Sequence, residues 1–175
     1  YIFLHFVNSL QDDGSFSRET EDERNRLTEL HQEREASLTR ALMLCNKTLA
    51  MFGYLSSDEK IRKLFLLPDM VGRLCSMLLH VMTKLVGSKS VDIKVQNPEK
   101  YNFQPKVMLK DLTSIFCNFV GYDTFYSEVA SNGYFKNSPR ILEKCGTTCN
   151  KLAILSSSEI ENFSEIVKQV NAKDG

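Results

Sequence analysis

The chain has 175 residues, of which 42% are hydrophobic and 25% charged, and its 22 basic and 22 acidic residues cancel to a formal net charge of zero. This composition excludes a disordered chain and a membrane-embedded one. A zero net charge without a local basic patch also argues against binding to nucleic acid or to an anionic membrane. The length suffices for one domain with a sizeable core, or for a few layers of a helical repeat.

The cysteine pattern indicates a reduced protein. The five cysteines are scattered and mostly embedded in apolar helical pattern: Cys45, Cys75, Cys117, Cys145 and Cys149. An odd, scattered set fits buried thiols better than the disulfide framework of a secreted protein. We therefore expect a cytoplasmic or nuclear protein.

The first ten residues, "YIFLHFVNSL", are apolar nearly all round. They are too few to span a bilayer, and they lack the basic flank and cleavage site of a signal peptide. We expect them to form the end of a buried helix, and because the chain starts at Tyr1 we expect a fragment of something longer. The following "QDDGSFS" is rich in turn-forming residues and predicts a break.

One long helix is predicted from about Ser17 to Leu55. Its first half is almost entirely charged, and opposite charges four residues apart, such as Asp22 and Arg26, favour a solvated helix face over a partner-binding arm across residues 18–35. Its second half places a core face at three- and four-residue steps: Leu38, Ala41, Leu42, Cys45, Leu49 and Phe52.

Two further helices follow, separated by Pro68. The first is predicted to start at an N-cap Ser56 or Ser57 and to end before that proline. The second, "PDMVGRLCSMLLHVMTKLVG", has Pro68 in its first turn and Gly87 just past its end. Its apolar positions cover most of the circumference, which predicts burial on more than one side.

A connector, residues 88–105, precedes four more helical patterns at residues 105–120, 122–132, 138–155 and 156–172. The last two patterns each begin with a serine, and Ser156 with Glu159 has the spacing of a capping box. The alternation in "SVDIKVQ" is too short to predict a strand. We therefore predict an all-α fold, an irregular helical stack without a fixed repeat period.

Candidate chemistry is sparse. Cys145 and Cys149 lie four residues apart, whereas a redox or metal site calls for a two-residue gap or further ligands, so core packing is the favoured interpretation. A thiol enzyme using either cysteine stays an alternative, and it predicts selective alkylation of one of them. His5, His31 and His80 stand apart from any nucleophile and base. We predict no catalytic residue, no cofactor and no metal site.

The connector carries a distinctive pattern. The stretch "VGSKSVDIKVQNPEKYNFQPKVMLKDLTSIFCNF" resembles the signature "VGPK…LKV…NPEKY.F.PK.LL…I…L" of ubiquitin conjugation factors of the U-box chain-elongating family. The matching positions are Val86, Gly87, Lys89, Lys94, Val95, Asn97, Pro98, Glu99, Lys100, Tyr101, Phe103, Pro105, Lys106, Leu109 and Ile115. The resemblance covers residues 50–120 and weakens on both flanks; "KCGTTCNK" has no counterpart in it.

This resemblance implies an armadillo-like helical stack, with residues 1–175 forming the C-terminal portion of the elongating factor core. It implies extension of ubiquitin chains on substrates destined for proteasomal degradation, carried out with a ubiquitin-conjugating enzyme and a segregase ATPase. In this family a zinc-free U-box at the C-terminus recruits the conjugating enzyme. No U-box pattern occurs before Gly175, so we expect the fragment alone to be inactive, with the U-box to follow.

The connector is expected to turn one helix layer into the next. Pro98 and Pro105 disfavour continuous helix, Pro105 can open the next helix, and the rings of Tyr101 and Phe103 can anchor the loop. The alternative function is a generic helical adaptor unrelated to ubiquitin, for which the signature match would be fortuitous.

Overall fold

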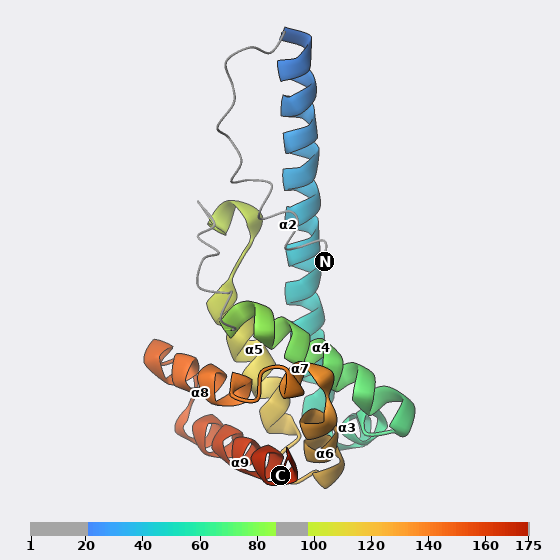
Figure 1. Ribbon diagram of the computed structural model, residues 1–175, viewed down its shortest axis with the longest axis vertical. Coiled ribbons are helices and arrows are strands. Elements are labelled where there is room, and N and C mark those ends of the chain that lie inside the picture. Colours follow the sequence, from blue (N-terminus) through green and yellow to red (C-terminus); the bar gives the residue numbers. More distant parts are fainter. Residues whose placement is uncertain (1–20, 87–97, 175) are drawn as a thin grey trace. The chain divides into compact units, whose positions relative to one another are not determined.

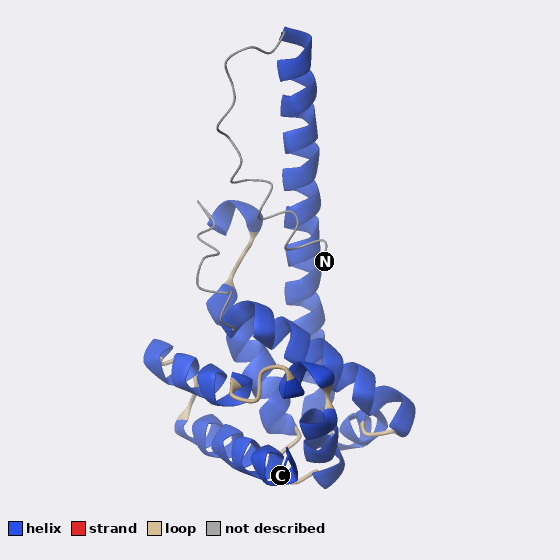
Figure 2. Ribbon diagram, viewed as in Figure 1, coloured by secondary structure: helices blue, strands red, loops and turns tan. Residues whose placement is uncertain are grey.

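The computed structural model describes residues 21–86 and 98–174. Within these residues every regular element is a helix and no strand occurs (Figure 2). The all-α prediction is therefore confirmed. The predictions made for the apolar opening, the turn-rich break, Gly87 and the short alternation fall on residues 1–20 and 87–97, which lie outside the described residues.

The elements follow one another as α2 (Glu21–Ser57), α3 (Glu59–Phe65), α4 (Pro68–Val86), the 3₁₀ turn η1 (Pro98–Tyr101), α5 (Pro105–Asn118), α6 (Asp123–Ser131), α7 (Gly133–Lys136), α8 (Ile141–Leu152) and α9 (Ser157–Asp174) (Figure 1). Their contacts divide the chain into two units. Of the described residues, the first unit holds 21–46 and 98–104, and the second holds 47–86 and 105–174.

In the first unit, α2 begins with a solvated stretch. Three acidic residues occupy its first turn, where carboxylates interact favourably with the positive end of the helix dipole. Burial begins at Leu38 and continues at Leu42, while Cys45 is half-buried. Ala41, predicted on the same face, is instead exposed, because it lies toward the edge of that face and no described residue covers it.

The second unit contains the larger core. There α4 contacts α3, α5, α6, α7 and α8, which confirms its predicted burial on more than one side. In Figure 1, α8 and α9 lie next to each other beside α5, as their contacts require. At the centre, Phe119 stacks on Phe125 at 4.6 Å between ring centroids, and Phe116 meets both Phe125 and Phe163 edge-on. Such aromatic pairs add to the free energy gained from burying the rings.

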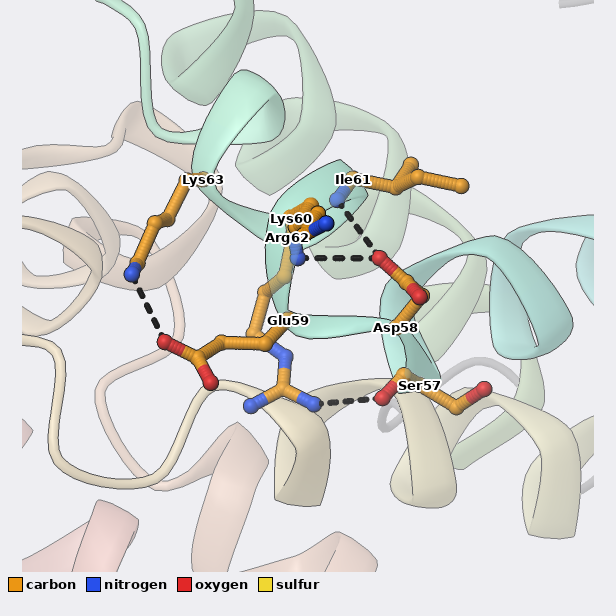
Figure 3. A network of polar contacts seen from close by, with 7 residues as sticks. All are labelled: Ser57, Asp58, Glu59, Lys60, Ile61, Arg62 and Lys63. Carbon is orange, nitrogen blue, oxygen red and sulfur yellow. Dashed lines mark hydrogen bonds and ion pairs between the residues drawn. The ribbon is translucent and has the colours of Figure 1, made fainter.

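The start of α3 corrects a predicted cap. Asp58, rather than Ser56 or Ser57, is the N-cap, since its Oδ1 accepts hydrogen bonds from the backbone N–H groups of Lys60 and Ile61 at 2.9 and 3.0 Å (Figure 3). The two serines belong to the last turn of α2, where their hydroxyls donate to carbonyls three residues back. A carboxylate at the N-cap satisfies two otherwise unpaired donors and suits the helix dipole.

The later helices match the predictions with two differences. Ser156 and Glu159 form the predicted capping box at α9: Ser156 N donates to Glu159 Oε2 at 2.9 Å, and Glu159 N donates to Ser156 Oγ at 3.3 Å. At α8, however, Arg140 and not Ser138 is the N-cap, because the chain turns once more before the helix. The short helix α7 was not predicted; the side chain of Asn132 caps it by accepting from Tyr134 N.

No single helix in the described ranges is long and apolar enough to cross a membrane. Taken together, α3 and α4 reach that length and hydropathy, but the chain bends by 91° between them.

Candidate functional site

The connector docks on α2 in the first unit. After η1 the backbone of Asn102 adopts a left-handed conformation with φ of 53°, a region that asparagine tolerates better than most residues. Asn46 of α2 donates from Nδ2 to the carbonyl oxygen of Asn102 at 3.0 Å. This bond fixes the turn against the helix.

The ring of Tyr101 is the apolar anchor of the connector. It packs with Leu38 and Leu42 of α2 and is only 7% exposed, and Phe103 packs against the same cluster while staying half-buried. Burying these rings removes apolar surface from water at roughly 25 cal/mol per Å². The predicted anchoring role of Tyr101 and Phe103 is confirmed, with Tyr101 the more deeply buried of the two.

A polar cluster closes over this anchor. The carboxylate of Glu35 accepts from the Tyr101 hydroxyl at 2.7 Å and from Lys100 Nζ at 2.8 and 2.9 Å. The same ammonium lies 5.4 Å from the centroid of the Tyr101 ring, within range of a cation–π contact. One carboxylate of α2 thus binds two consecutive residues of the connector.

These contacts shift the titration of all three groups. The hydrogen bonds from Lys100 and then from Tyr101 lower the pKa of Glu35 below its ordinary value of 4.5. The bond to Glu35 raises the pKa of Tyr101 and, in the same way, that of Lys100. The cluster therefore has its full set of charges and hydrogen bonds across the neutral range.

The chemistry of this arrangement is docking. Glu35 and Lys100 are already paired, with side chains 30% and 57% exposed, and water screens an exposed pair so that it adds little to stability. Neither group is held in the desolvated state that general acid–base catalysis demands. The connector site holds a chain segment in place, and the buried ring supplies most of the free energy.

The cysteine pair lies in the second unit, at the contact between α5 and α8. Cys145 and Cys149 are both fully buried, which agrees with the predicted core packing. Thr113 Oγ1 donates to the carbonyl of Leu109 at 2.7 Å and lies 3.7 Å from Cys145 Sγ and 3.5 Å from Cys149 Sγ. Since the hydroxyl proton is already used, Thr113 can act toward these sulfurs only as an acceptor.

The hydrogen bond between these two thiols shifts their pKa values in opposite directions, since the bond from Cys145 lowers the pKa of Cys149 to about 7. The hydrogen bond with Cys149 and burial raise the pKa of Cys145 well above its ordinary value of 9.0. Burial also raises the pKa of Cys117 to about 12, and its thiol donates to the carbonyl of Glu159 at 3.4 Å. A thiol enzyme needs an accessible thiolate, and the structure places these sulfurs in the core instead.

The two histidines in the described residues, His31 and His80, do not form a catalytic group. His31 lies on α2, and His80 of α4 packs edge-on against Tyr134 at 5.1 Å between ring centroids. Burial lowers the pKa of His80, so it is neutral at physiological pH. His5 lies outside the described residues. Within residues 21–86 and 98–174, no three His, Cys, Asp or Glu side chains come together in a way that could hold a metal ion.

A shallow depression of about 210 Å³ lies in the second unit. It is lined by Ser127, Ala130, Ser131, Lys136, Lys173 and Asp174. One of its lysines, Lys173, pairs with Asp123 at 2.7 Å. The lining combines both charge signs, and the Ser131 hydroxyl donates to the carbonyl of Glu128 at 3.1 Å.

Three residues of these clusters escaped the sequence analysis: Glu35, Asn46 and Thr113. Glu35 stands in a charged run where any carboxylate looks solvated. Asn46 carries a weak signal, because an amide on an otherwise apolar helix face must find a partner when it is buried. Thr113 has the same kind of signal on the buried face of α5.

A comparison with models of protein families shows which family this chain belongs to. The model of the ubiquitin elongating factor core matches residues 4–171, nearly the whole chain. The chain belongs to this family. The docked connector, with Tyr101 buried and Lys100 on Glu35, is therefore a feature of an elongating factor core.

Individual relatives agree. The chain is 35% identical over 134 residues to the E4 ubiquitin-protein ligase UFD2 of Saccharomyces cerevisiae, covering 75% of this chain and 14% of that protein. It is 32% identical over 140 residues to the ubiquitin conjugation factor E4 of Schizosaccharomyces pombe, covering 80% of this chain and 13% of that protein. The ubiquitin conjugation factor E4 A of Bos taurus is 25% identical, over 96% of this chain and 19% of that protein.

The chain thus spans less than a fifth of the length of these relatives. The family match, which extends far beyond the connector on both sides, means that the signature is not fortuitous. The alternative of a helical adaptor unrelated to this family is therefore wrong.

Proposed function

We propose that this chain is a scaffold segment of a ubiquitin chain-elongation factor, which extends ubiquitin chains on substrates destined for proteasomal degradation. The observation that carries the proposal is the match of the elongating factor core to residues 4–171. Relatives named as ubiquitin conjugation factors, 32% and 35% identical to this chain, support it.

The scaffold role rests on the chemistry of the described residues. A polar cluster on Glu35 docks the connector, and the thiols of the second unit are buried in its core. We propose that conjugating-enzyme recruitment is performed by a U-box outside these 175 residues. We propose an armadillo-like stack for the whole core; the helices of the second unit pack on one another, including pairs distant in sequence such as α6 with α9 and α4 with α8.

The partners follow from this role. They would be a ubiquitin-conjugating enzyme, acting through the U-box, ubiquitinated substrates, and a segregase ATPase that delivers them. We propose a cytoplasmic and nuclear location, supported by five free cysteines, none of which is in a disulfide. Nucleic acid and membranes are not among the proposed partners.

A chain-extension assay tests the proposal. A substrate carrying one ubiquitin is incubated with ubiquitin-activating enzyme, ATP, ubiquitin and a panel of conjugating enzymes. The 175-residue chain is added in one arm and the gene-length protein in another. We expect chain extension only with the gene-length protein. Extension by the 175-residue chain alone would show that it is not merely a scaffold.

A variant of the gene-length protein separates the scaffold from the recruitment step. Tyr101→Ala undocks the connector but leaves any U-box untouched, so binding to the conjugating enzyme should persist while chain extension falls. A gene-length protein that extends no chain with any conjugating enzyme would remove the proposed activity altogether.

A further inference from the structure

Residues 98–104, the docked segment, are held on α2 by a small apolar contact. The ring of Tyr101 packs against Leu38 and Leu42. Phe103 lies half-buried at the edge of this cluster, so one deeply buried ring supplies most of the apolar part of docking. A segment that buries so little apolar surface opens at a lower free energy than the core of a domain.

Side chains of α2 make the polar contacts to the docked segment. Glu35 binds Lys100 and Tyr101, and water screens the ion pair because both charged side chains are partly exposed. Asn46 donates to the carbonyl oxygen of Asn102. Bonds from side chains can break while the backbone hydrogen bonds within α2 remain intact. The docked segment can therefore leave without unfolding the helix.

Two features of the docked state oppose docking. The backbone of Asn102 is left-handed, with φ of 53°, which costs free energy for any residue with a Cβ, although less for asparagine. Oδ1 of Asn46 is buried, and none of the residues that the structure describes donates a hydrogen bond to it. A buried acceptor without a donor also costs free energy. Both costs disappear when the segment leaves α2, because the backbone can then relax and water can reach the amide.

The contacts of the docked segment should break together. Lys100, Tyr101 and Asn102 are consecutive, and the first two belong to the same 3₁₀ turn, η1. The Tyr101 ring carries the hydroxyl that binds Glu35, so the ring cannot withdraw from Leu42 without breaking that hydrogen bond. Loss of the apolar contact and loss of the polar contacts are therefore one event.

We propose that the docked segment detaches from α2 as one unit while the second unit stays folded. Detachment breaks the bonds from Glu35 and Asn46 and uncovers Leu38 and Leu42. These four residues follow one another at steps of three, four and four, which places them on one face of α2. The open state therefore presents a face that carries a carboxylate, two leucines and an amide. This opening does not depend on the proposed function in ubiquitin chain extension.

Thiol labelling of the 175-residue chain measures the opening. Leu42→Cys puts a thiol beneath the Tyr101 ring. Leu49→Cys is the matched control, seven residues further along the same face of α2 and buried in the second unit. Cys45, a half-buried native thiol, is replaced by serine in both variants. Leu38→Cys, also in contact with the ring, replaces Leu42→Cys if that variant does not fold.

The labelling is followed by mass spectrometry in rising urea, below the unfolding transition. We expect the thiol at position 42 to react roughly tenfold or more faster than the thiol at position 49. Its rate should hardly depend on urea, because detachment exposes little surface, whereas the rate at position 49 should rise steeply. Equal rates with equal urea dependence would mean that the segment leaves α2 only when the whole chain unfolds, and would overturn the proposal.

The backbone N–H of residue 42 distinguishes detachment from unfolding of α2. Its hydrogen exchange reports the helix itself, so it should require a larger opening free energy than labelling of the thiol on the same residue. Equal opening free energies would mean that α2 unfolds, which also overturns the proposal. Asn102→Ala lacks the side-chain amide that supports a left-handed backbone and should raise the thiol rate at position 42 roughly threefold. An unchanged rate would contradict detachment of this segment.

Discussion

The Tyr101 hydroxyl donates a 2.7 Å hydrogen bond to Glu35 Oε1 across a sequence separation of 66 residues. The ring beneath this hydroxyl is buried against Leu38 and Leu42. A single tyrosine therefore contributes both the apolar and the polar part of the contact between the connector and α2.

Truncation of Tyr101 separates the two parts. Tyr101→Phe should cost about 1–2 kcal/mol, since it removes a hydrogen bond to a charged acceptor, and Tyr101→Ala should cost about 2–4 kcal/mol, since it also removes the ring. Phe103→Ala should cost less, because that ring is only half-buried. Hydrogen exchange of residues 98–104, with urea unfolding alongside, measures the loss. Unchanged protection in Tyr101→Ala would contradict the anchoring role.

Acid should release the connector. Because the fold lowers the pKa of Glu35, its contribution to stability is complete above the ordinary value of 4.5 and is lost as the pH falls through the lower folded-state pKa. At the alkaline end, the raised pKa of Tyr101 means that docking weakens as the pH rises above 10.0. Hydrogen exchange of residues 98–104, corrected for intrinsic rates, should show that protection falls both at acid pH and at alkaline pH.

Glu35→Gln is the matched variant for this pH dependence. It keeps an acceptor for the Tyr101 hydroxyl but cannot titrate. The loss of exchange protection at acid pH should therefore disappear, while the loss of protection at alkaline pH should remain. An identical acid profile in the variant and the wild type would assign the transition to other carboxylates.

The five cysteines should react in the order of their burial. Cys45 is half-buried and the other four are buried, so a thiol reagent should modify Cys45 first in the native chain and reach all five only in denaturant. Counting modified thiols against time by mass spectrometry checks this. Rapid, selective alkylation of Cys149 or Cys145 in the folded chain would restore the thiol-enzyme interpretation.

Thr113→Val probes the support of the buried thiols. The substitution keeps the shape of the side chain but removes the oxygen close to both Cys145 and Cys149. We expect a loss of about 1–2 kcal/mol in the free energy of unfolding, because the sulfurs lose an acceptor in the core. Thr113→Ser restores the hydroxyl and should recover part of the loss, whereas equal losses in both variants would point to the methyl group.

The start of α3 offers a paired test of helix capping. Asp58→Ala removes the acceptor of two backbone N–H groups and should cost about 1 kcal/mol. Ser57→Ala, next to it, removes only an exposed hydroxyl and should change the stability by less than about 0.5 kcal/mol. Thermal unfolding of both variants decides which residue is the cap.

Local signals in the sequence predicted most of the helices. Pro68 and Pro105 mark helix starts because a proline restricts the backbone conformation at its own position. Ser156 and Glu159 form a capping box within a single helical turn. Asp58 was overlooked because two serines precede it, although a carboxylate there serves equally well. The four-residue α7 is too short to show any periodicity.

The connector site was predicted in part. Tyr101 and Phe103 were expected to be anchors because large rings in a polar loop usually find a core. Their partner Glu35 was not expected to bind the connector. Many carboxylates lie on this charged helix, and the sequence does not show which of them will contact a residue 66 positions later. Pairings of this kind are decided by tertiary structure alone.

Docking through Glu35 has a consequence for exchanging parts between relatives. Lys100 and Tyr101 travel with the connector, whereas the carboxylate that binds them is supplied by α2. A chimera that receives only this connector, on an α2 without a carboxylate at the position of Glu35, would inherit an ammonium and a hydroxyl without their acceptor. Grafts should therefore be designed as two segments, with the middle of α2 transferred together with the loop.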